Sequence, residues 1–106
     1  MTNKAIPLPK LSGFTERNGD WFVEEIPLAD LAKQYGTPLY VFDELTLRSK
    51  CQEFIAEFTK CYQNTSVAYA SKAFLNQAMA KIIKEEGLNL DVVSGGELSV
   101  AHRAKF

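Results

Sequence analysis

Apolar residues recur at helical spacing in two stretches of the chain, and each stretch has a signal for where its helix begins or ends. Asp43 is a good N-cap for a long helix, and Gly87 is a good residue to end a second one. Spacings of three and four residues place the apolar positions on one face of each predicted helix. These positions are Leu47, Cys51, Phe54, Ile55 and Phe58 in the first helix and Leu75, Ala78, Met79, Ile82 and Ile83 in the second.

Two short apolar runs predict strands on either side of the second helix. The first extends from Ser66 to Phe74 and is interrupted by Lys72, and the second extends from Leu88 to Val93. Ser94 then begins another predicted helix, which has no capping residue or glycine before Phe106. Strand, helix, parallel strand and helix is the repeating unit of an α/β sheet, and this pattern allows either a barrel or an open doubly wound sheet.

The N-terminal part of the chain has a different pattern. Residues 1–18 contain prolines and no sustained period, so we expect an extended lead-in there. Residues 21–23 predict a strand, and the apolar positions from Leu28 to Tyr35 predict a short helix that Gly36 ends. Residues 38–42 are expected to be extended.

The composition is that of an ordinary globular protein and narrows the range of partners. Lys and Arg number 12 against 13 Asp and Glu, so nucleic acid is not an expected partner. No apolar stretch approaches the roughly 18 residues of a membrane span, and the first residues lack the apolar core of a signal peptide, so we expect a cytoplasmic protein. Cys51 and Cys61 are expected about 15 Å apart on one helix, too far for a disulfide, and Cys51 is expected to be buried. Neither cysteine has neighbours at metal-ligand spacing, so no metal is predicted.

Lys72 is the residue whose position most strongly suggests chemistry. A lysine at the end of a buried strand is costly to bury unless its charge is neutralised or paired. A partly desolvated lysine amine on a rigid strand is the nucleophile that an aldehyde cofactor requires. The alternative is a lysine that ends the strand and reaches solvent, as most strand-end lysines do.

The residues around Lys72 resemble those of a known family. The segments 69–73 (Tyr-Ala-Ser-Lys-Ala) and 91–98 (Asp-Val-Val-Ser-Gly-Gly-Glu-Leu), preceded by 35–44, resemble the N-terminal part of the diaminopimelate decarboxylases. That family uses pyridoxal phosphate to make L-lysine from meso-diaminopimelate, releasing carbon dioxide. The resemblance extends from about Gly19 to Phe106.

The resemblance implies a fold and a domain division. It implies an α/β protein that contains the N-terminal part of an alanine-racemase-type (β/α)8 barrel, with residues 67–70 as the first barrel strand. Residues 1–42 would be a lead-in and strands of a separate β-domain, and residues 43–106 would be the first units of the barrel. Such a barrel needs roughly 250 residues, so the 106 residues are expected to be a fragment that is inactive alone.

The resemblance also implies site residues and partners. Lys72 would be the catalytic residue that binds pyridoxal phosphate, and Asp91 would lie close to the cofactor, either beside the amine or ordering backbone amides at the strand end. Phosphate- and substrate-binding groups are expected beyond Phe106, in an enzyme that acts on an amino acid as a homodimer. Ser94 and Glu97 have the spacing of a capping box, which we favour over a cofactor role, and His102 is assigned no role.

Alternatives within and outside the fold stay open at this point. An alanine racemase is disfavoured because Phe74-Leu75-Asn76 follows the lysine motif where racemases carry a histidine- and glycine-containing run. Ornithine and arginine decarboxylases share the lysine motif but usually differ in the double glycine before glutamate, and a carboxynorspermidine decarboxylase is a further alternative. From a different class, the chain could be a non-catalytic pyridoxal-phosphate carrier or a fragment that docks on a partner through an unpaired sheet edge.

Overall fold

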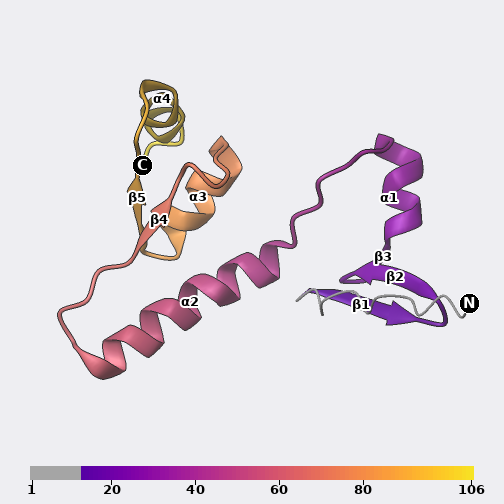
Figure 1. The fold of residues 1–106 in the computed structure, drawn as a ribbon, viewed down its shortest axis with the longest axis horizontal. Helices are drawn as coiled ribbons and strands as arrows, with labels where there is room; N and C mark the ends of the chain where they lie inside the picture. The colour runs from indigo at the N-terminus through magenta and orange to yellow at the C-terminus, as the bar shows by residue number, and fades with distance from the viewer. Residues whose placement is uncertain (1–12) are drawn as a thin grey trace, which may run out of the picture. The chain divides into compact units, whose positions relative to one another are not determined.

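The computed structural model describes residues 13–106, whose helices and strands are shown in Figure 1. They divide into two compact units, one up to Thr46 and one from Leu47 to Phe106. The part of the predicted lead-in that covers residues 1–12 lies outside the described residues. The prediction of a separate β-domain over residues 1–42 stays a prediction.

The first unit contains a three-stranded antiparallel sheet followed by a short helix. Strands β1 (Phe14–Arg17), β2 (Asp20–Val23) and β3 (Ile26–Pro27) pair in chain order, and α1 (Leu28–Tyr35) follows. The expectation of an unpacked lead-in up to residue 18 was therefore wrong for β1. Asn18 and Gly19 form the two-residue turn between β1 and β2, both with positive φ, of 53° and 88°. An Asn-Gly pair favours this hairpin turn, whose twist matches that of the flanking strands.

The predicted boundaries around residues 35–44 are confirmed. Helix α1 ends at Tyr35, and Gly36 follows it with a φ of 82°. Residues 38–42 form neither helix nor strand. Asp43 precedes α2 (Glu44–Cys61), where its carboxylate accepts a hydrogen bond from the Leu45 amide at 3.2 Å and another from the Thr46 hydroxyl. These bonds satisfy groups that the first turn of a helix otherwise leaves unpaired.

The second unit contains the predicted strand and helix repeat. After α2 come β4 (Ala68–Ala70), α3 (Gln77–Glu85), β5 (Asn89–Asp91) and α4 (Gly95–Arg103). Strands β4 and β5 are parallel, with Ala68 opposite Asn89 and Ala70 opposite Asp91. Both strands are shorter than predicted, but their order and direction are as expected.

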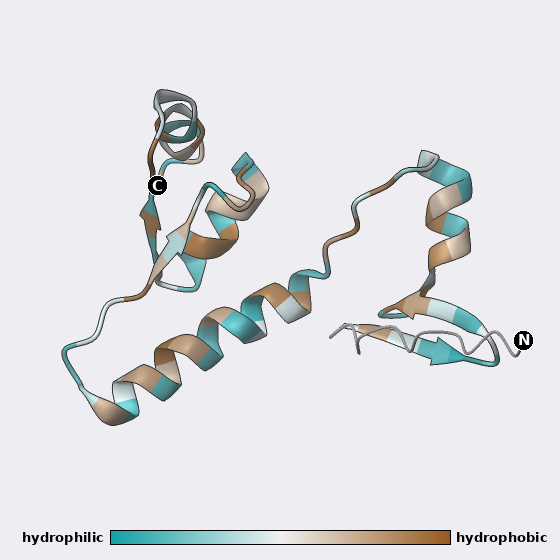
Figure 2. Ribbon diagram, in the orientation of Figure 1, coloured by the Kyte–Doolittle hydropathy of each residue, from teal (hydrophilic) through white to brown (hydrophobic). Residues whose placement is uncertain are grey.

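The core of the second unit lies among α2, α3 and one face of the β4–β5 sheet. Its buried residues are Cys51, Met79, Ile83 and Leu88, and Tyr69 and Leu90 of the two strands pack against them. Cys51 is only 8% exposed, so its predicted burial is confirmed, and both cysteines are free. Figure 2 shows how apolar and polar residues alternate along α2 and α3. Because side chains alternate across a strand, the helix-covered face takes Tyr69 and leaves Ala68 and Ala70 for the other face.

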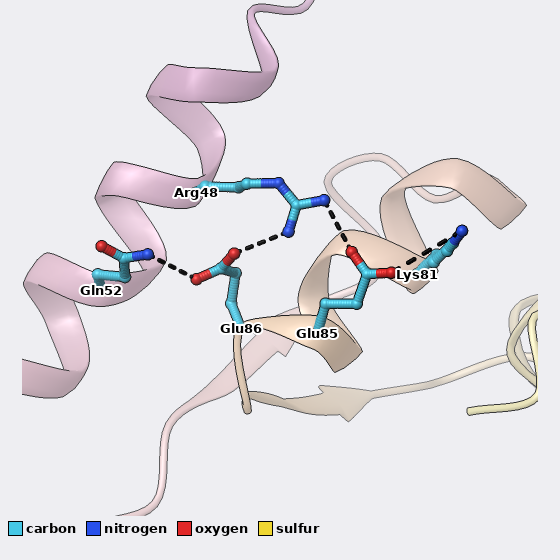
Figure 3. Close-up of polar contacts among 5 residues, drawn as sticks. All are labelled: Arg48, Gln52, Lys81, Glu85 and Glu86. Atoms are coloured by element: carbon cyan, nitrogen blue, oxygen red, sulfur yellow. Dashed lines mark hydrogen bonds and ion pairs between the residues drawn. The ribbon is translucent and has the colours of Figure 1, made fainter.

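A polar network joins α2 to the end of α3 (Figure 3). Arg48 of α2 donates one hydrogen bond to Glu85 and one to Glu86, each at 2.7 Å. Gln52 donates to the second oxygen of Glu86 at 2.9 Å, and Lys81 lies 3.8 Å from Glu85. Hydrogen bonding to Arg48 lowers the pKa of both carboxyl groups below their ordinary value of 4.5. The network therefore fixes the two helices at a point on the rim of the core.

Helices α3 and α4 end in the same way, although the sequence predicts this for α3 alone. After α3, Gly87 has a φ of 81°, and the Leu88 amide donates to the Ile83 carbonyl at 3.1 Å. After α4, Lys105 has a φ of 56°, and the Phe106 amide donates to the Ala101 carbonyl at 3.0 Å. Both are the hydrogen-bond pattern of a Schellman motif. The expectation of an uncapped helix up to Phe106 was wrong, because a lysine takes the left-handed position that usually belongs to glycine.

Candidate active site

Lys72 lies in the turn that follows β4. The strand ends at Ala70, and residues 71–73 form a turn in which the Ala73 amide donates to the Ala70 carbonyl at 3.1 Å. Lys72 is exposed in this structure, whereas its neighbour Ser71 is buried. Of the two alternatives that the sequence left open for this strand-end lysine, the described residues have the one that reaches solvent. Strand β4 ends at Ala70, two residues before Lys72. The chain turns directly after the Ser71 amide has made the last bond to β5.

Asp91 is the last residue of β5 and lies at the same end of the sheet. It pairs with Ala70, and its carbonyl accepts a hydrogen bond from the Ser71 amide at 3.1 Å. Lys72 thus follows directly after the residue whose backbone is bonded to Asp91. The structure brings both predicted site residues to the carboxyl edge of two parallel strands, which is where barrels of this kind carry their active sites.

The face of the sheet that the α2–α3 core does not use is lined by small or polar residues. Ala68 and Ala70 lie opposite Asn89 and Asp91 across the two strands. Residues paired across parallel strands lie on the same face, so these four share the face on which Asp91 projects. The exposed Lys72 amine, at the end of this sheet, is accessible to an aldehyde. These residues therefore fit a cofactor that is bound covalently through its aldehyde carbon.

Ser94 and Glu97 cap α4, as predicted, although one of the two bonds differs. The Ser94 hydroxyl accepts from the Glu97 amide at 3.2 Å. The Glu97 carboxylate accepts from the Val93 amide at 2.7 Å, one residue before the amide that a standard capping box uses. This arrangement ties the backbone after Asp91 to the first turn of α4.

Tyr69 is a residue near Lys72 that the sequence analysis did not single out. Its ring packs against the core, and its hydroxyl donates a hydrogen bond of 2.7 Å to the carbonyl of Phe74. Burial raises the pKa of the Tyr69 phenol above its ordinary value. The bond spans the turn that carries Lys72. A tyrosine three residues before the lysine, on the core-facing side of its strand, was the available signal.

Other site classes find less support in the described part of the chain. Across residues 13–106, no group of three or more His, Cys, Asp or Glu side chains is arranged to hold a metal ion. No helix among these residues combines the length and apolar character needed to cross a membrane. His102 lies exposed near the end of α4.

The sequence matches a known family and several characterised relatives. Residues 47–106 match the family described as "Pyridoxal-dependent decarboxylase, pyridoxal binding domain". The chain is 53% identical over 81 residues to the diaminopimelate decarboxylase of Mycobacterium tuberculosis and 51% identical over 76 residues to that of Bacillus subtilis. These alignments cover 76% and 72% of the chain and 17% of each relative, so the chain spans about a sixth of their length.

Solved structures agree with the sequence match. The diaminopimelate decarboxylase of M. jannaschii, in complex with L-lysine, matches with a TM-score of 0.80 and 33% identity, over 89% of this chain and 23% of that one. A second structure of the M. jannaschii enzyme matches with a TM-score of 0.72 and 29% identity, over 88% of this chain and 22% of the other. The α/β order described above and these matches confirm the predicted alanine-racemase-type fold class. The chain belongs to the pyridoxal-dependent decarboxylase family, whose pyridoxal-binding domain is matched by residues 47–106.

Proposed function

We propose that this chain supplies the lysine-bearing part of a pyridoxal-phosphate-dependent decarboxylase that converts meso-diaminopimelate to L-lysine and carbon dioxide. The observation that carries the proposal is the position of Lys72, exposed in a turn at the carboxyl edge of β4, in a chain of the pyridoxal-binding family. The names of the relatives, one of them solved with L-lysine bound, favour diaminopimelate over ornithine or arginine as the substrate.

Lys72 has two tasks in this proposal. Its Nζ would hold the cofactor covalently through the aldehyde carbon, whose oxygen leaves as water, and would be freed when the substrate amine takes its place. When bound, pyridoxal phosphate supplies a conjugated ring that accepts the electron pair left by the departing carbon dioxide. The freed Nζ of Lys72, or a group outside these residues, then returns a proton to the α-carbon.

Asp91 is the second cofactor-contacting residue of the proposal. Its carboxylate belongs to the last residue of β5, and its carbonyl is bonded to the amide of Ser71, next to Lys72. In the proposal its carboxylate lies close to the cofactor that Lys72 would hold. The complete enzyme is proposed to act in the cytoplasm as a homodimer.

Borohydride reduction of the full-length protein in the presence of pyridoxal phosphate tests the site. We expect mass spectrometry to find the reduced cofactor on the peptide that contains Lys72. Lys81 and Lys84 of α3 are internal controls, because they are exposed lysines of the same unit. A label on either of them instead would contradict the assignment. Release of carbon dioxide from meso-diaminopimelate, with ornithine and arginine as comparison substrates, tests the reaction and separates an enzyme from a non-catalytic carrier.

A further inference from the structure

Two backbone hydrogen bonds and one side-chain hydrogen bond hold the turn that carries Lys72. Two are backbone bonds near its start, from Ser71 to the Asp91 carbonyl and from Ala73 to the Ala70 carbonyl, both at 3.1 Å. The third comes from a side chain, the Tyr69 hydroxyl, which donates to the Phe74 carbonyl at 2.7 Å. Lys72 therefore lies between β4, which contains Tyr69, and Phe74, whose carbonyl accepts the bond from Tyr69.

The phenol is well suited to hold this carbonyl in a fixed position. Tyr69 belongs to β4, and its ring packs against the cluster formed by Cys51, Met79, Ile83 and Leu88. A tyrosine has few rotatable bonds, so a ring fixed by packing also fixes its hydroxyl. Burial raises the pKa of the phenol, which keeps the hydroxyl protonated and able to donate at neutral pH.

The Tyr69 bond reaches a later residue of the chain than the two backbone bonds do. The backbone bonds near the start involve residues 70, 71, 73 and 91, whereas Phe74 lies beyond them. After Phe74, Leu75 packs against the core and Asn76 caps α3 by accepting from the Met79 amide at 2.8 Å. The Tyr69 bond thus connects strand β4 to Phe74, the residue that leads into the start of α3.

We infer that Tyr69 is a positioning residue, whose hydroxyl holds the turn in the shape that presents the Lys72 amine to the cofactor. The inference rests on the proposed role of Lys72. Tyr69 touches neither cofactor nor substrate in this account and acts through the Phe74 carbonyl. Tyr69→Phe removes the donor and keeps the ring that packs in the core, so the variant is expected to fold.

The experiment compares Tyr69→Phe with Tyr62→Phe in the full-length protein. Tyr62 is a matched control, because it is a tyrosine of the same unit, 67% exposed, that follows α2 at a distance in sequence from the turn. Hydrogen exchange of the cofactor-free protein is measured for the peptide covering residues 71–76. We expect about 3- to 10-fold faster exchange in Tyr69→Phe, as loss of one hydrogen bond predicts, and no change in Tyr62→Phe.

Cofactor affinity and overall stability complete the test. In Tyr69→Phe we expect pyridoxal phosphate to bind about 3- to 10-fold more weakly, with a urea midpoint close to that of Tyr62→Phe. Unchanged exchange of residues 71–76 would overturn the inference. Faster exchange with unchanged affinity would overturn it as well, because the bond would then hold the turn without positioning the amine. Failure of the proposed function shows separately, as borohydride label on a lysine other than Lys72 in the unmodified protein.

Discussion

At the scale of single residues, Lys72 combines an accessible side chain with a constrained backbone. Its side chain is exposed, while the residue before it is buried and bonded to β5 through its amide. A nucleophile needs access to its substrate, and a residue that holds a cofactor needs a backbone in a fixed position. The turn after β4 meets both needs, because the exposed lysine directly follows the buried Ser71, whose amide is bonded to β5.

Replacing Lys72 by alanine in the full-length protein should abolish decarboxylation and preserve the fold. The covalent attachment and the proton carrier are both assigned to this amine, so we expect a loss of at least about 10³-fold in kcat. An exposed turn residue contributes little to stability, and the free energy of unfolding should change by less than about 0.5 kcal/mol. Carbon dioxide release and a thermal melt measure the two effects.

Lys81→Ala is the matched control for that variant. Lys81 is an exposed lysine of α3 in the same unit, with Glu85 at 3.8 Å as its partner. It should keep near-normal turnover. Near-normal turnover of meso-diaminopimelate by Lys72→Ala would show instead that Lys72 has a structural role only.

The sequence was sufficient to locate Lys72 and Asp91 at one sheet edge, but it did not reveal the contacts around them. Their places follow from two parallel strands, whose carboxyl ends must meet. The Tyr69 bond depends on the path of the turn between residues 70 and 76, which the apolar pattern does not specify. The apolar pattern also left open whether Lys72 is partly desolvated or reaches solvent, since the run of small apolar residues does not mark the residue at which the strand ends. Roles for both site residues stay predictions.

At the scale of elements, the Arg48 network is the polar contact that joins α2 to α3. Arg48 is partly buried and donates to two consecutive carboxylates, Glu85 and Glu86, at the end of α3. Two charged hydrogen bonds from one planar guanidinium fix the orientation of the guanidinium as well as its distance from the two carboxylates. The network lies beside Cys51 at the core. Burial is the main cause of the raised pKa of the Cys51 thiol, the Glu86 carboxylate raises it further, and Arg48 opposes the rise.

Arg48→Met should reduce the stability of the full-length protein at neutral pH and flatten its dependence on pH in the acid range. Both carboxyl groups have a pKa lowered below 4.5 by hydrogen bonding to Arg48. A lowered pKa in the folded state contributes stability above the unfolded value near 4.5, and that stability is lost as the pH falls through the folded pKa. The unmodified protein should therefore lose more of its urea midpoint than the variant between pH 6 and pH 3.

Lys50→Met on the same helix controls for the loss of a surface cation. Lys50 pairs with Glu53 at 2.6 Å within α2, and both side chains are more than half exposed. Exposed pairs of this kind contribute little, so this variant should follow the unmodified protein at every pH. Equal acid sensitivity of Arg48→Met and the unmodified protein would contradict the role given to the network.

The order of helices and strands was predictable, whereas several boundaries were not. The helical spacing of apolar residues located α2 and α3, and Asp43, Gly36 and Gly87 marked ends that the structure confirms. Strand β1 was missed although Asn18 and Gly19 carry a hairpin signal, because its polar residues show no apolar alternation. The end of α4 was missed because Lys105 adopts a left-handed backbone conformation, which is uncommon for lysine and cannot be expected from its residue type.

At the scale of the whole molecule, the described residues leave much apolar surface uncovered. Phe54 and Phe58 of the predicted α2 stripe are 54% and 55% exposed and stack on each other with ring centres 6.4 Å apart. The β4–β5 sheet has only two strands of three residues each, so each strand keeps one unpaired edge. Contiguous apolar surface and free edges are sites at which chains associate.

The 106 residues expressed alone should therefore lack decarboxylase activity and be aggregation-prone or only partly folded. The second unit has six buried apolar residues, namely Cys51, Met79, Ala80, Ile83, Leu88 and Ala101. So small a core does not offset the conformational entropy that folding removes, and a short chain buries a smaller share of its surface than a full domain does. Size-exclusion chromatography and far-UV circular dichroism with a thermal melt measure the outcome. A soluble monomer with a sharp cooperative transition would contradict the prediction, because it would mean that two parallel strands and their helices are sufficient for a stable domain.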